Sequence, residues 1–461
     1  MGKTIDLTTG NLKINIVRFA IPVMLSGILQ LLFSQADIIV CNFFGSEYSV
    51  GAINATSPFT NLILNILIGF SVGANVCISN AVGAKLKENA ERIIGTSLIL
   101  GLVCSVVLGA LGVIITRPVL ELMGTPAECI DLSTQYLQIY FCGVPFIILY
   151  DFAAALLRGM GDSKRPFYFL TLAGVLNVGL NLIFVICFDM DVSGVALATT
   201  LTQGVAAFLS IYVLFKGHLF ANFHWKYFRF KKKEVVSIIK VGIPAGIQSS
   251  FFSISNLIIQ SSINSFGANA VTGSGAGAQI ESYLNTIQNC FGQACIAFVA
   301  ANYGSHNIKN IKTAIKWCLI YASSVTVVTS LVAVLARDQL LSLFLNSDNA
   351  EALKVGSTRV LINCGLYITY VFTDCPPYAE RGLKYSLIPT IISLLGICGS
   401  RLLFIFTLFR MEQFHSMDWL FYTYPISWAL TGAAHLVALL YMYRKTKEKI
   451  LGGASLVAES K

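Results

Sequence analysis

Asp37 is the strongest chemical signal in this sequence, because it stands inside a long apolar segment. A carboxylate in such a segment is costly unless it is paired or hydrated, so it indicates a functional site. Asn177 and Asn181 are four residues apart in a second apolar segment, which places their amides on one face of a helix. Together these groups offer oxygen ligands, which hard cations prefer, and a carboxylate can also carry a proton. Structural hydrogen bonds between helices are the alternative for all three side chains.

The elements that carry these groups are apolar helices. The chain has 461 residues, of which 55% are hydrophobic and 12% charged, about half of the roughly 25% that is usual in soluble domains. The surplus of apolar surface must therefore face lipid. We predict an all-α polytopic membrane protein with twelve transmembrane helices in two pseudo-symmetric six-helix bundles around a central cavity. The predicted spans are residues 14–43, 54–82, 93–116, 134–157, 167–188, 193–215, 238–265, 271–301, 314–336, 357–379, 386–409 and 419–443.

Basic residues are distributed unequally between the loops of this topology. With the N-terminus placed in the cytoplasm, 26 of the 32 Lys and Arg residues fall on the inner side and five on the outer side, Arg359 among these five. The positive-inside rule then predicts that both termini are cytoplasmic. The same asymmetry explains the net charge of +9 without nucleic acid, which we do not expect as a partner.

The longest polar interval, which contains Lys231, Lys232 and Lys233 in a row, divides the chain into two sets of six spans. We predict an N-terminal lobe over residues 1–215 and a basic cytoplasmic linker over 216–237, lying on anionic headgroups. A C-terminal lobe over 238–443 and a cytoplasmic tail over 444–461 follow.

The two halves resemble each other in sequence. Pro22 in "IPVML" pairs with Pro244 in "IPAGI" at an offset of 222 residues. The pattern Asp-(six residues)-Arg-Gly-(six residues)-Pro occurs at 151–166 and again at 374–389, at an offset of 223. Each half has six spans, so the repeats run in the same direction through the bilayer. Two such bundles suit a transporter that works by alternating access, whereas receptors and most channels do not need this plan.

Five segments, taken in order, resemble those of the multidrug and toxic compound extrusion (MATE) transporters, in the branch near the DNA-damage-inducible F-type proteins of Gram-positive bacteria. They are "IPVMLSGILQLLFSQADIIVCNFFG", "GFSVGANVCISNAVGAK", "LRGMGDSKRP", "NVGLNLIFVI…VSGVALATTLTQ" and "YPISWALTGAAH". The resemblance covers essentially the whole chain.

The resemblance implies a secondary active exporter of amphipathic organic cations, such as drugs or dyes, in a bacterial cell membrane, driven by inward protons or sodium. Thr199 matches a family Thr near the Asp37 cavity, and Asn177 matches the family motif Asn-(three residues)-Asp. Asn181 departs from that motif, since Asp is often found there. With one carboxylate instead of two, a proton at Asp37 is favoured, and a sodium ion at Asp37, Asn177 and Thr199 is the alternative. We expect no cofactor, and a monomer in contact with lipids.

Further polar residues in the spans are candidates for the substrate cavity. Asp151 and Asp374 occupy equivalent places in the two halves and either attract cationic substrates or pair with a basic residue of their own lobe. Gln248, Asn256 and Gln260 share one helix face, because they lie at intervals of eight and four residues. We expect these three to line the C-terminal half of the cavity.

Glu281 and Arg401 complete the predicted cavity. Glu281 has no obvious cationic neighbour in sequence. Arg401 is the only Lys or Arg that we place deep in a span, and we expect Asp374 or Glu281 as its counter-charge. A structural ion pair and a role in substrate binding both remain open for Arg401.

Two other classes of function differ from an exporter of cations in what the sequence should contain. A flippase for lipid-linked sugars or other lipids belongs to the same superfamily, but such proteins tend to have a more basic cavity. Here the four embedded acids outnumber the one embedded base, which favours cationic cargo. An enzyme is not expected, because the sequence has no HExxH, P-loop, GxSxG or CxxC pattern.

Overall fold

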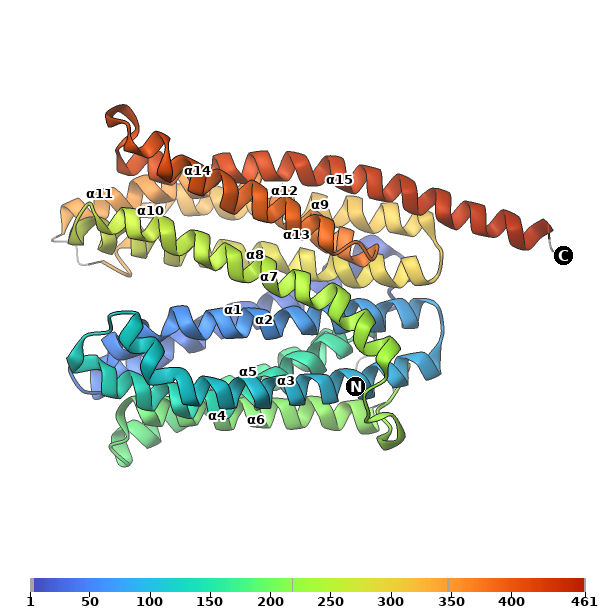
Figure 1. The fold of residues 1–461 in the computed structure, drawn as a ribbon, viewed down its shortest axis with the longest axis horizontal. Helices are drawn as coiled ribbons and strands as arrows, with labels where there is room; N and C mark the ends of the chain where they lie inside the picture. The colour runs from blue at the N-terminus through green and yellow to red at the C-terminus, as the bar shows by residue number, and fades with distance from the viewer. Residues whose placement is uncertain (1–3, 218, 346–348, 460–461) are drawn as a thin grey trace. The chain divides into compact units, whose positions relative to one another are not determined.

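The computed structural model describes residues 4–217, 219–345 and 349–459, and within these ranges the regular structure is all helical (Figure 1). The first half contains α1 (Leu12–Phe44), α2 (Ser49–Gly83), α3 (Lys87–Leu122), α4 (Ala127–Gly159), α5 (Lys164–Leu182), the π-helical turn η1 (Ile183–Cys187), α6 (Asp191–Lys216) and η2 (Trp225–Tyr227). The second half contains α7 (Lys232–Asn264), α8 (Ala268–Gly304), α9 (Ile308–Leu335), α10 (Arg337–Leu341), α11 (Ala350–Arg359), the π-helical turn η3 (Val360–Cys364), α12 (Ile368–Gly382), α13 (Leu387–Ser393), the π-helical turn η4 (Leu394–Gly399), α14 (Ser400–Phe406), η5 (Leu408–Arg410), η6 (Glu412–Phe414) and α15 (Met417–Glu459).

The predicted fold class is confirmed, since the chain is an all-helical, multi-pass membrane protein. Ten of its described helical segments are long and apolar enough to cross a membrane. Two predicted spans are not among these ten, namely α8 and the segment formed by α11, η3 and α12. Both are rich in polar side chains, and α8 carries Glu281, Asn285, Gln288 and Asn289 within three turns. The segment of α11, η3 and α12 is also interrupted by a turn at residues 366–367, so that neither piece has the length of a complete span. The polar residues of the two segments make many of the polar contacts described below.

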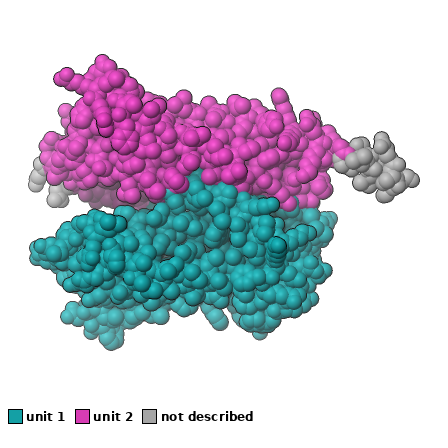
Figure 2. Space-filling model, viewed as in Figure 1, with its two compact units in different colours: residues 1–7, 21–250 teal, residues 8–20, 251–461 magenta. Residues whose placement is uncertain are grey.

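Contacts group the described chain into two compact units, coloured separately in Figure 2. Unit 1 contains Ile21–Ser250 and the segment that ends at Leu7. Unit 2 contains Thr8–Ala20 and the chain from Phe251 onward. The division therefore falls inside α1 and inside α7, the two helices that the sequence repeat pairs. Each of these helices has part of its length in each unit.

Unit 1 is built around α4, which packs against α2, α3 and α6. Phe141, Phe152 and Leu157 of α4 are completely or almost completely buried in its core. The basic segment 216–237, predicted as a linker, packs onto this unit, where the Thr96 hydroxyl donates to the Arg229 carbonyl at 3.4 Å.

Unit 2 is built around α8 and α12, which pack against each other. α8 also contacts α9 and α11, and α12 also contacts α15. In Figure 1, α15 is the long red helix, and it continues to Glu459 through most of the segment predicted as a tail.

A turn between α4 and α5 explains the "RGMGDSKRP" motif of unit 1. Gly161 has a φ of +86°, a backbone conformation that favours glycine, and a Cβ there would lie 2.0 Å from the Ile5 carbonyl oxygen. Asp162 then accepts from the Arg165 backbone N–H at 3.1 Å and pairs with its guanidinium at 3.3 Å. Burial raises the pKa of the Asp162 carboxyl, and the contacts with Arg165 oppose that rise. The motif thus closes α4 and starts α5 in a fixed direction.

Glycines bring two helices of unit 1 into backbone contact. α2 carries Gly69 and Gly73, and α7 carries Gly242 and Gly246, so each helix has two glycines four residues apart. A Cβ on Gly69 would lie 2.4 Å from the Gly246 nitrogen, and one on Gly73 would lie 2.3 Å from the Ile238 carbonyl oxygen. Small residues at such spacing let membrane helices approach closely.

We predict that Gly69→Ala destabilises the protein, because the added methyl group must push α2 away from the α7 backbone. The expected loss is about 1–3 kcal/mol, seen as a lower apparent Tm in detergent. Gly275→Ala is the matched control, since nothing lies within 4 Å of a Cβ built there. Equal apparent Tm values for the two variants would contradict the close crossing of α2 and α7.

Candidate functional site

The four residues predicted to bind the coupling ion come together in unit 1. Asp37 lies on α1, Asn177 and Asn181 on α5, and Thr199 on α6. Asn181 Nδ2 donates to Asp37 Oδ1 at 2.5 Å and to Asn177 Oδ1 at 3.2 Å. Asn177 Nδ2 donates to Thr199 Oγ1 at 3.2 Å, and Thr199 Oγ1 donates to Asp37 Oδ2 at 3.5 Å. The side chains form a closed ring of hydrogen bonds that joins three helices.

The ring has one unsatisfied acceptor. Asn181 is completely buried, and its Oδ1 has no hydrogen-bond partner among the described residues. Asp37 and Thr199 are each partly exposed. The ring therefore presents the carboxylate of Asp37, which can take up a proton, beside neutral oxygens, one of which is free to accept a hydrogen bond or to ligate a cation.

The second acidic candidate of unit 1 stands apart from this ring. No basic side chain of the described residues lies within 4.0 Å of the Asp151 carboxylate, although the charge of Arg158 reaches it. Tyr140 lies within electrostatic reach of both Asp151 and Asp37. Asp151 is partly exposed, so it is not sealed into the core of unit 1.

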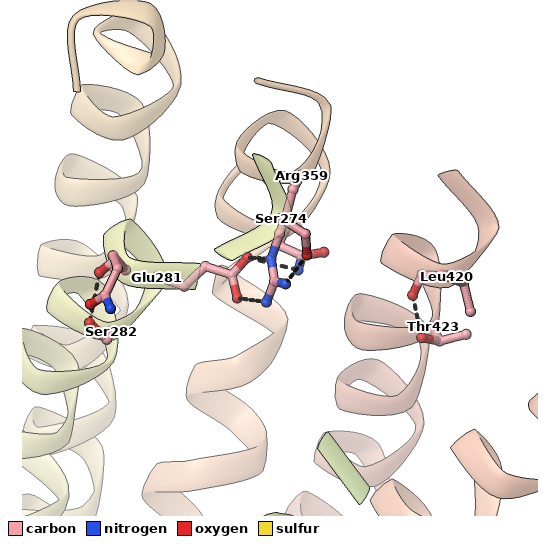
Figure 3. A network of polar contacts seen from close by, with 8 residues as sticks. Ser274, Glu281, Ser282, Arg359, Leu420 and Thr423 are labelled. Atoms are coloured by element: carbon pink, nitrogen blue, oxygen red, sulfur yellow. Dashed lines mark hydrogen bonds and ion pairs between the residues drawn. The ribbon is translucent and has the colours of Figure 1, made fainter. Parts of the chain in front are cut away.

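Glu281 has a basic partner in unit 2 (Figure 3). Arg359 Nε donates to Glu281 Oε1 at 2.7 Å and its Nη2 donates to Oε2 at 3.0 Å, which makes a two-pronged ion pair. Arg359 Nη1 donates to Ser274 Oγ at 2.7 Å, and Asn363 Nδ2 donates to Glu281 Oε1 at 2.9 Å. The guanidinium also lies over the rings of Phe421 and Tyr424, at 5.8 and 5.4 Å. Glu281 is thus neutralised within its own unit.

Asp374 on α12 is held by amides rather than by a cation. Gln288 Nε2 and Asn289 Nδ2, both on α8, donate to Asp374 Oδ2 at 3.2 and 3.3 Å. Asn289 Nδ2 also donates to Tyr378 Oη at 2.9 Å. Asp374 is partly exposed and, unlike Glu281, has no basic side chain of the described residues within 4.0 Å of its carboxylate.

The expected ion pair of Arg401 with Asp374 or Glu281 is wrong. Arg401 is 1% exposed, and no carboxylate of the described residues lies within 4.0 Å of it. Its Nε donates to Ser427 Oγ at 3.1 Å and its Nη1 donates to Asn256 Oδ1 at 2.8 Å. The guanidinium lies 4.5 Å from the Tyr424 ring centroid, and Glu281 pairs with Arg359 instead.

The statement that Arg401 is the only embedded base is also wrong. Arg359, counted with the outer loops, is 5% exposed, and Arg381, counted with the inner ones, is 5% exposed as well. Unit 2 therefore balances Glu281, Asp374 and Glu380 against three buried guanidiniums. The excess of acids that favoured cationic cargo is confined to unit 1.

The three amides predicted on one face of α7 have different environments. Asn256 accepts from Arg401, and Gln260 Nε2 donates to Asn264 Oδ1 at 3.0 Å. Gln248 lies on the part of α7 that belongs to unit 1, whereas Asn256 and Gln260 belong to unit 2.

Sequence reasoning missed two buried polar groups. Arg359 lies within the predicted span 357–379, which was a signal that it is not in a loop. Glu380 follows the predicted end of that span, yet it is completely buried and pairs with His435. Nothing in the spacing of Glu380 and His435 predicts that contact.

A protein-family model described as MatE matches the chain twice, over residues 22–183 and 244–407. The two matches begin at Pro22 and Pro244, the prolines that the internal repeat pairs. The probable multidrug resistance protein YoeA of Bacillus subtilis is 28% identical over 436 residues, which are 92% of this chain and 91% of that protein. The probable multidrug resistance protein YpnP of the same organism is 31% identical over 310 residues, 67% of this chain and 69% of that protein.

Among solved structures, one described as a crystal structure of MATE in complex with MaL6 has the same fold. Its TM-score is 0.90 at 21% identity, with 97% of this chain and all of the other covered.

We predict that Glu281→Gln destabilises unit 2, because it leaves the Arg359 guanidinium buried without its counter-charge. Removing one partner of a buried pair costs about 3–5 kcal/mol, which should lower the apparent Tm in detergent. The double variant Glu281→Leu with Arg359→Met should recover much of that loss.

Glu88→Gln is the control, because Glu88 and Arg92 form an ion pair whose side chains are 63% and 39% exposed. We expect little change in Tm there. If Glu281→Gln has no larger effect than Glu88→Gln, the buried pair does not stabilise the unit.

Proposed function

This chain belongs to the MatE family of membrane transporters, and we propose that it is a multidrug exporter that expels amphipathic organic cations in exchange for inward protons. It is not an enzyme. The transport cycle is alternating access, in which the two halves of the repeat expose a cavity to each side of the membrane in turn. The names of the two Bacillus relatives support the assignment to multidrug resistance.

The observation that carries the choice of coupling ion is the ring of Asp37, Asn177, Asn181 and Thr199. It contains one carboxylate, and its side chains are joined by hydrogen bonds with donor–acceptor distances from 2.5 to 3.5 Å. Each oxygen of the ring except Asn181 Oδ1 already accepts one hydrogen bond from a side chain of the ring. A sodium ion needs several oxygen ligands and would have to share or displace these donors. A proton needs only one of these oxygens, so the geometry favours H⁺ over Na⁺.

Proton binding would rearrange the ring in a defined way. The ionised Asp37 accepts from Asn181 and from Thr199, whereas a protonated Asp37 must donate one O–H. The free Asn181 Oδ1 can receive that bond once the amide turns, because an Asn side chain carries both a donor and an acceptor. Such a turn breaks the bond from Asn181 to Asn177 and loosens the link between α1 and α5.

The substrate class follows from the acids of unit 1. Asp37 and Asp151 are both partly exposed and have no ion pair with a basic side chain in the described ranges. An amphipathic cation would be attracted by these carboxylates and by the aromatic rings of Tyr136 and Tyr140, which stack at 6.0 Å between centroids. The chain would work as a monomer in a bacterial cell membrane, with both termini in the cytoplasm. Within the family, it would belong to the branch near the DNA-damage-inducible F-type proteins.

A second candidate is a flippase for a lipid that carries a pyrophosphate. Arg401 is the observation that favours it, because this buried guanidinium has no carboxylate partner in the described residues and its Nη2 has no hydrogen-bond partner there. An anionic headgroup would supply the missing counter-charge.

Asp37→Asn should abolish proton-driven efflux of a cationic dye such as ethidium from proteoliposomes, because the ring loses its only titratable group. Asp131→Asn is the matched control, since Asp131 is 71% exposed and pairs with Arg117 at the surface of unit 1. Transport by Asp37→Asn at the wild-type rate would contradict the coupling site.

Asn181→Asp places a second carboxylate 2.5 Å from the first, at the atom that now donates to Asp37 Oδ1. Two carboxylates provide the oxygen ligands that sodium prefers. We expect this variant to respond to an imposed sodium gradient that leaves the wild type unaffected. A wild-type protein that already follows the sodium gradient would show that sodium is the coupling ion.

The two substrate classes can be separated by binding to the purified protein. We expect saturable binding of ethidium and none of a polyprenyl pyrophosphate, with Arg401→Gln leaving dye binding in place. Binding of the polyprenyl pyrophosphate that is lost in Arg401→Gln, without dye binding, would establish the flippase instead.

A further inference from the structure

Unit 2 contains a buried carboxylate–imidazole pair that the Asp37 ring does not use. Glu380 lies near the end of α12 and His435 in the middle of α15. His435 Nδ1 is 3.3 Å from Glu380 Oε1 and 3.2 Å from Oε2, and both side chains are 0% exposed. Two titratable groups are thus held together away from the solvent in the core of one unit.

A third helix completes the pair. Ser393, the last residue of α13, places its Oγ 2.9 Å from His435 Nε2. A hydroxyl can donate to a neutral imidazole nitrogen or accept from a protonated one. His435 therefore keeps a hydrogen bond at each ring nitrogen whether or not it carries the extra proton. The surroundings of the pair suit a group that changes its protonation state.

The fold does not require a carboxylate at this place. The position equivalent to Glu380 in the first half, at the offset of 223 that relates Asp151 to Asp374, is Leu157. Leu157 is also 0% exposed and stands directly before Arg158-Gly159, as Glu380 stands before Arg381-Gly382. Unit 1 fills the equivalent position with an apolar side chain. The fold alone therefore does not explain why unit 2 has a carboxylate there.

Among the described residues, few charged groups reach the pair from the helices that surround it. On α12 itself, Asp374 interacts with His435 and Arg381 interacts with Glu380. α13 contributes the neutral Ser393, and α8 and α9 contribute the thiols of Cys295 and Cys318, which lie together against α12. Asp374 and Arg381 have opposite charges, so the net charge of the cluster is set by the number of protons on Glu380 and His435.

We propose that Glu380 and His435 form a second proton-binding site, which must hold one proton before α12 and α15 close over it. This inference rests on the proposed function as a proton-driven exporter. With one proton the pair is neutral overall, either as a carboxylate with an imidazolium or as a carboxylic acid with an imidazole. With no proton or with two it carries a net charge, and burying an uncompensated charge is costly.

Burial also controls when that proton can leave. Groups that are 0% exposed exchange protons with water only when the helices that cover them separate. Release and binding of the proton are thereby tied to the opening of the contact between α12 and α15, which is the requirement for coupling to a conformational cycle.

The test is transport by the full-length protein in proteoliposomes that contain a trapped pH-sensitive dye, so that protons and ethidium are counted together. Glu380→Gln and His435→Gln should each move one proton fewer per ethidium than the wild type and should flatten the dependence of the rate on pH. Asp37→Asn should stop coupled transport altogether. Loss of transport thus identifies the Asp37 ring, and a lower proton count identifies the pair of Glu380 and His435.

The matched control is the pair of Glu91 and His224 in unit 1, 3.5 Å apart, in which the His224 side chain is 51% exposed. This pair is open to solvent through His224, so Glu91→Gln should leave the proton count and the pH profile unchanged. Apparent Tm values of all variants in detergent separate a loss of folding from a loss of proton binding.

Two results would overturn the proposal. If Glu380→Gln and His435→Gln fold and keep the wild-type proton count and pH profile, the pair is structural, and the proposed function stands without it. If the wild type moves no protons with ethidium, neither the pair nor the Asp37 ring couples protons, and the proposed function fails as well.

Discussion

Polar side chains inside a lipid-facing helical protein must find their hydrogen-bond partners within the protein, because the bilayer core offers none. This constraint accounts for the contacts that tie the helices of each unit together. Asp37 obtains two donors from α5 and α6, and Glu281 obtains a guanidinium from α11. Glu380 obtains an imidazole from α15. In each case the partner comes from another helix, so satisfying a buried acid also fixes the packing of its neighbours.

Where these polar groups occur, the helices that carry them depart from regular α geometry. The π-helical turn η1 begins two residues after Asn181, and η3 contains Asn363, which donates to Glu281. The turn η4 ends two residues before Arg401. A π-helical turn inserts an extra residue and changes the direction in which the following side chains point, and such turns often occur at functional sites. The irregular turns help to aim these side chains at partners that a straight helix would miss.

Much of the fold could be predicted from the sequence, because length and hydropathy identify a membrane helix without knowledge of its partners. Residue types and spacing singled out Asp37, Asn177 and Asn181 as polar groups in apolar segments, whereas the resemblance to the MATE family supplied Thr199 and the expectation that all four lie together. The partners of Arg401 and Glu281 could not be predicted from the sequence, because they depend on which faces of α7, α8, α11 and α14 meet. Counting embedded charges failed for the same reason, since Arg359 was assigned to a loop although it is buried opposite Glu281. The pair of Glu380 and His435, 55 residues apart, shows no sequence signal at all.

The glycine crossing of α2 and α7 has a mechanical consequence. Where two helices meet through side chains, ridges of one fill grooves of the other, and any rotation must lift the ridges out of the grooves. At Gly69 and Gly246 the backbones touch with no side chains between them. Two helix surfaces without side chains at the crossing can rotate or slide against each other while their backbones stay in contact. The crossing therefore combines close packing with a low resistance to rotation.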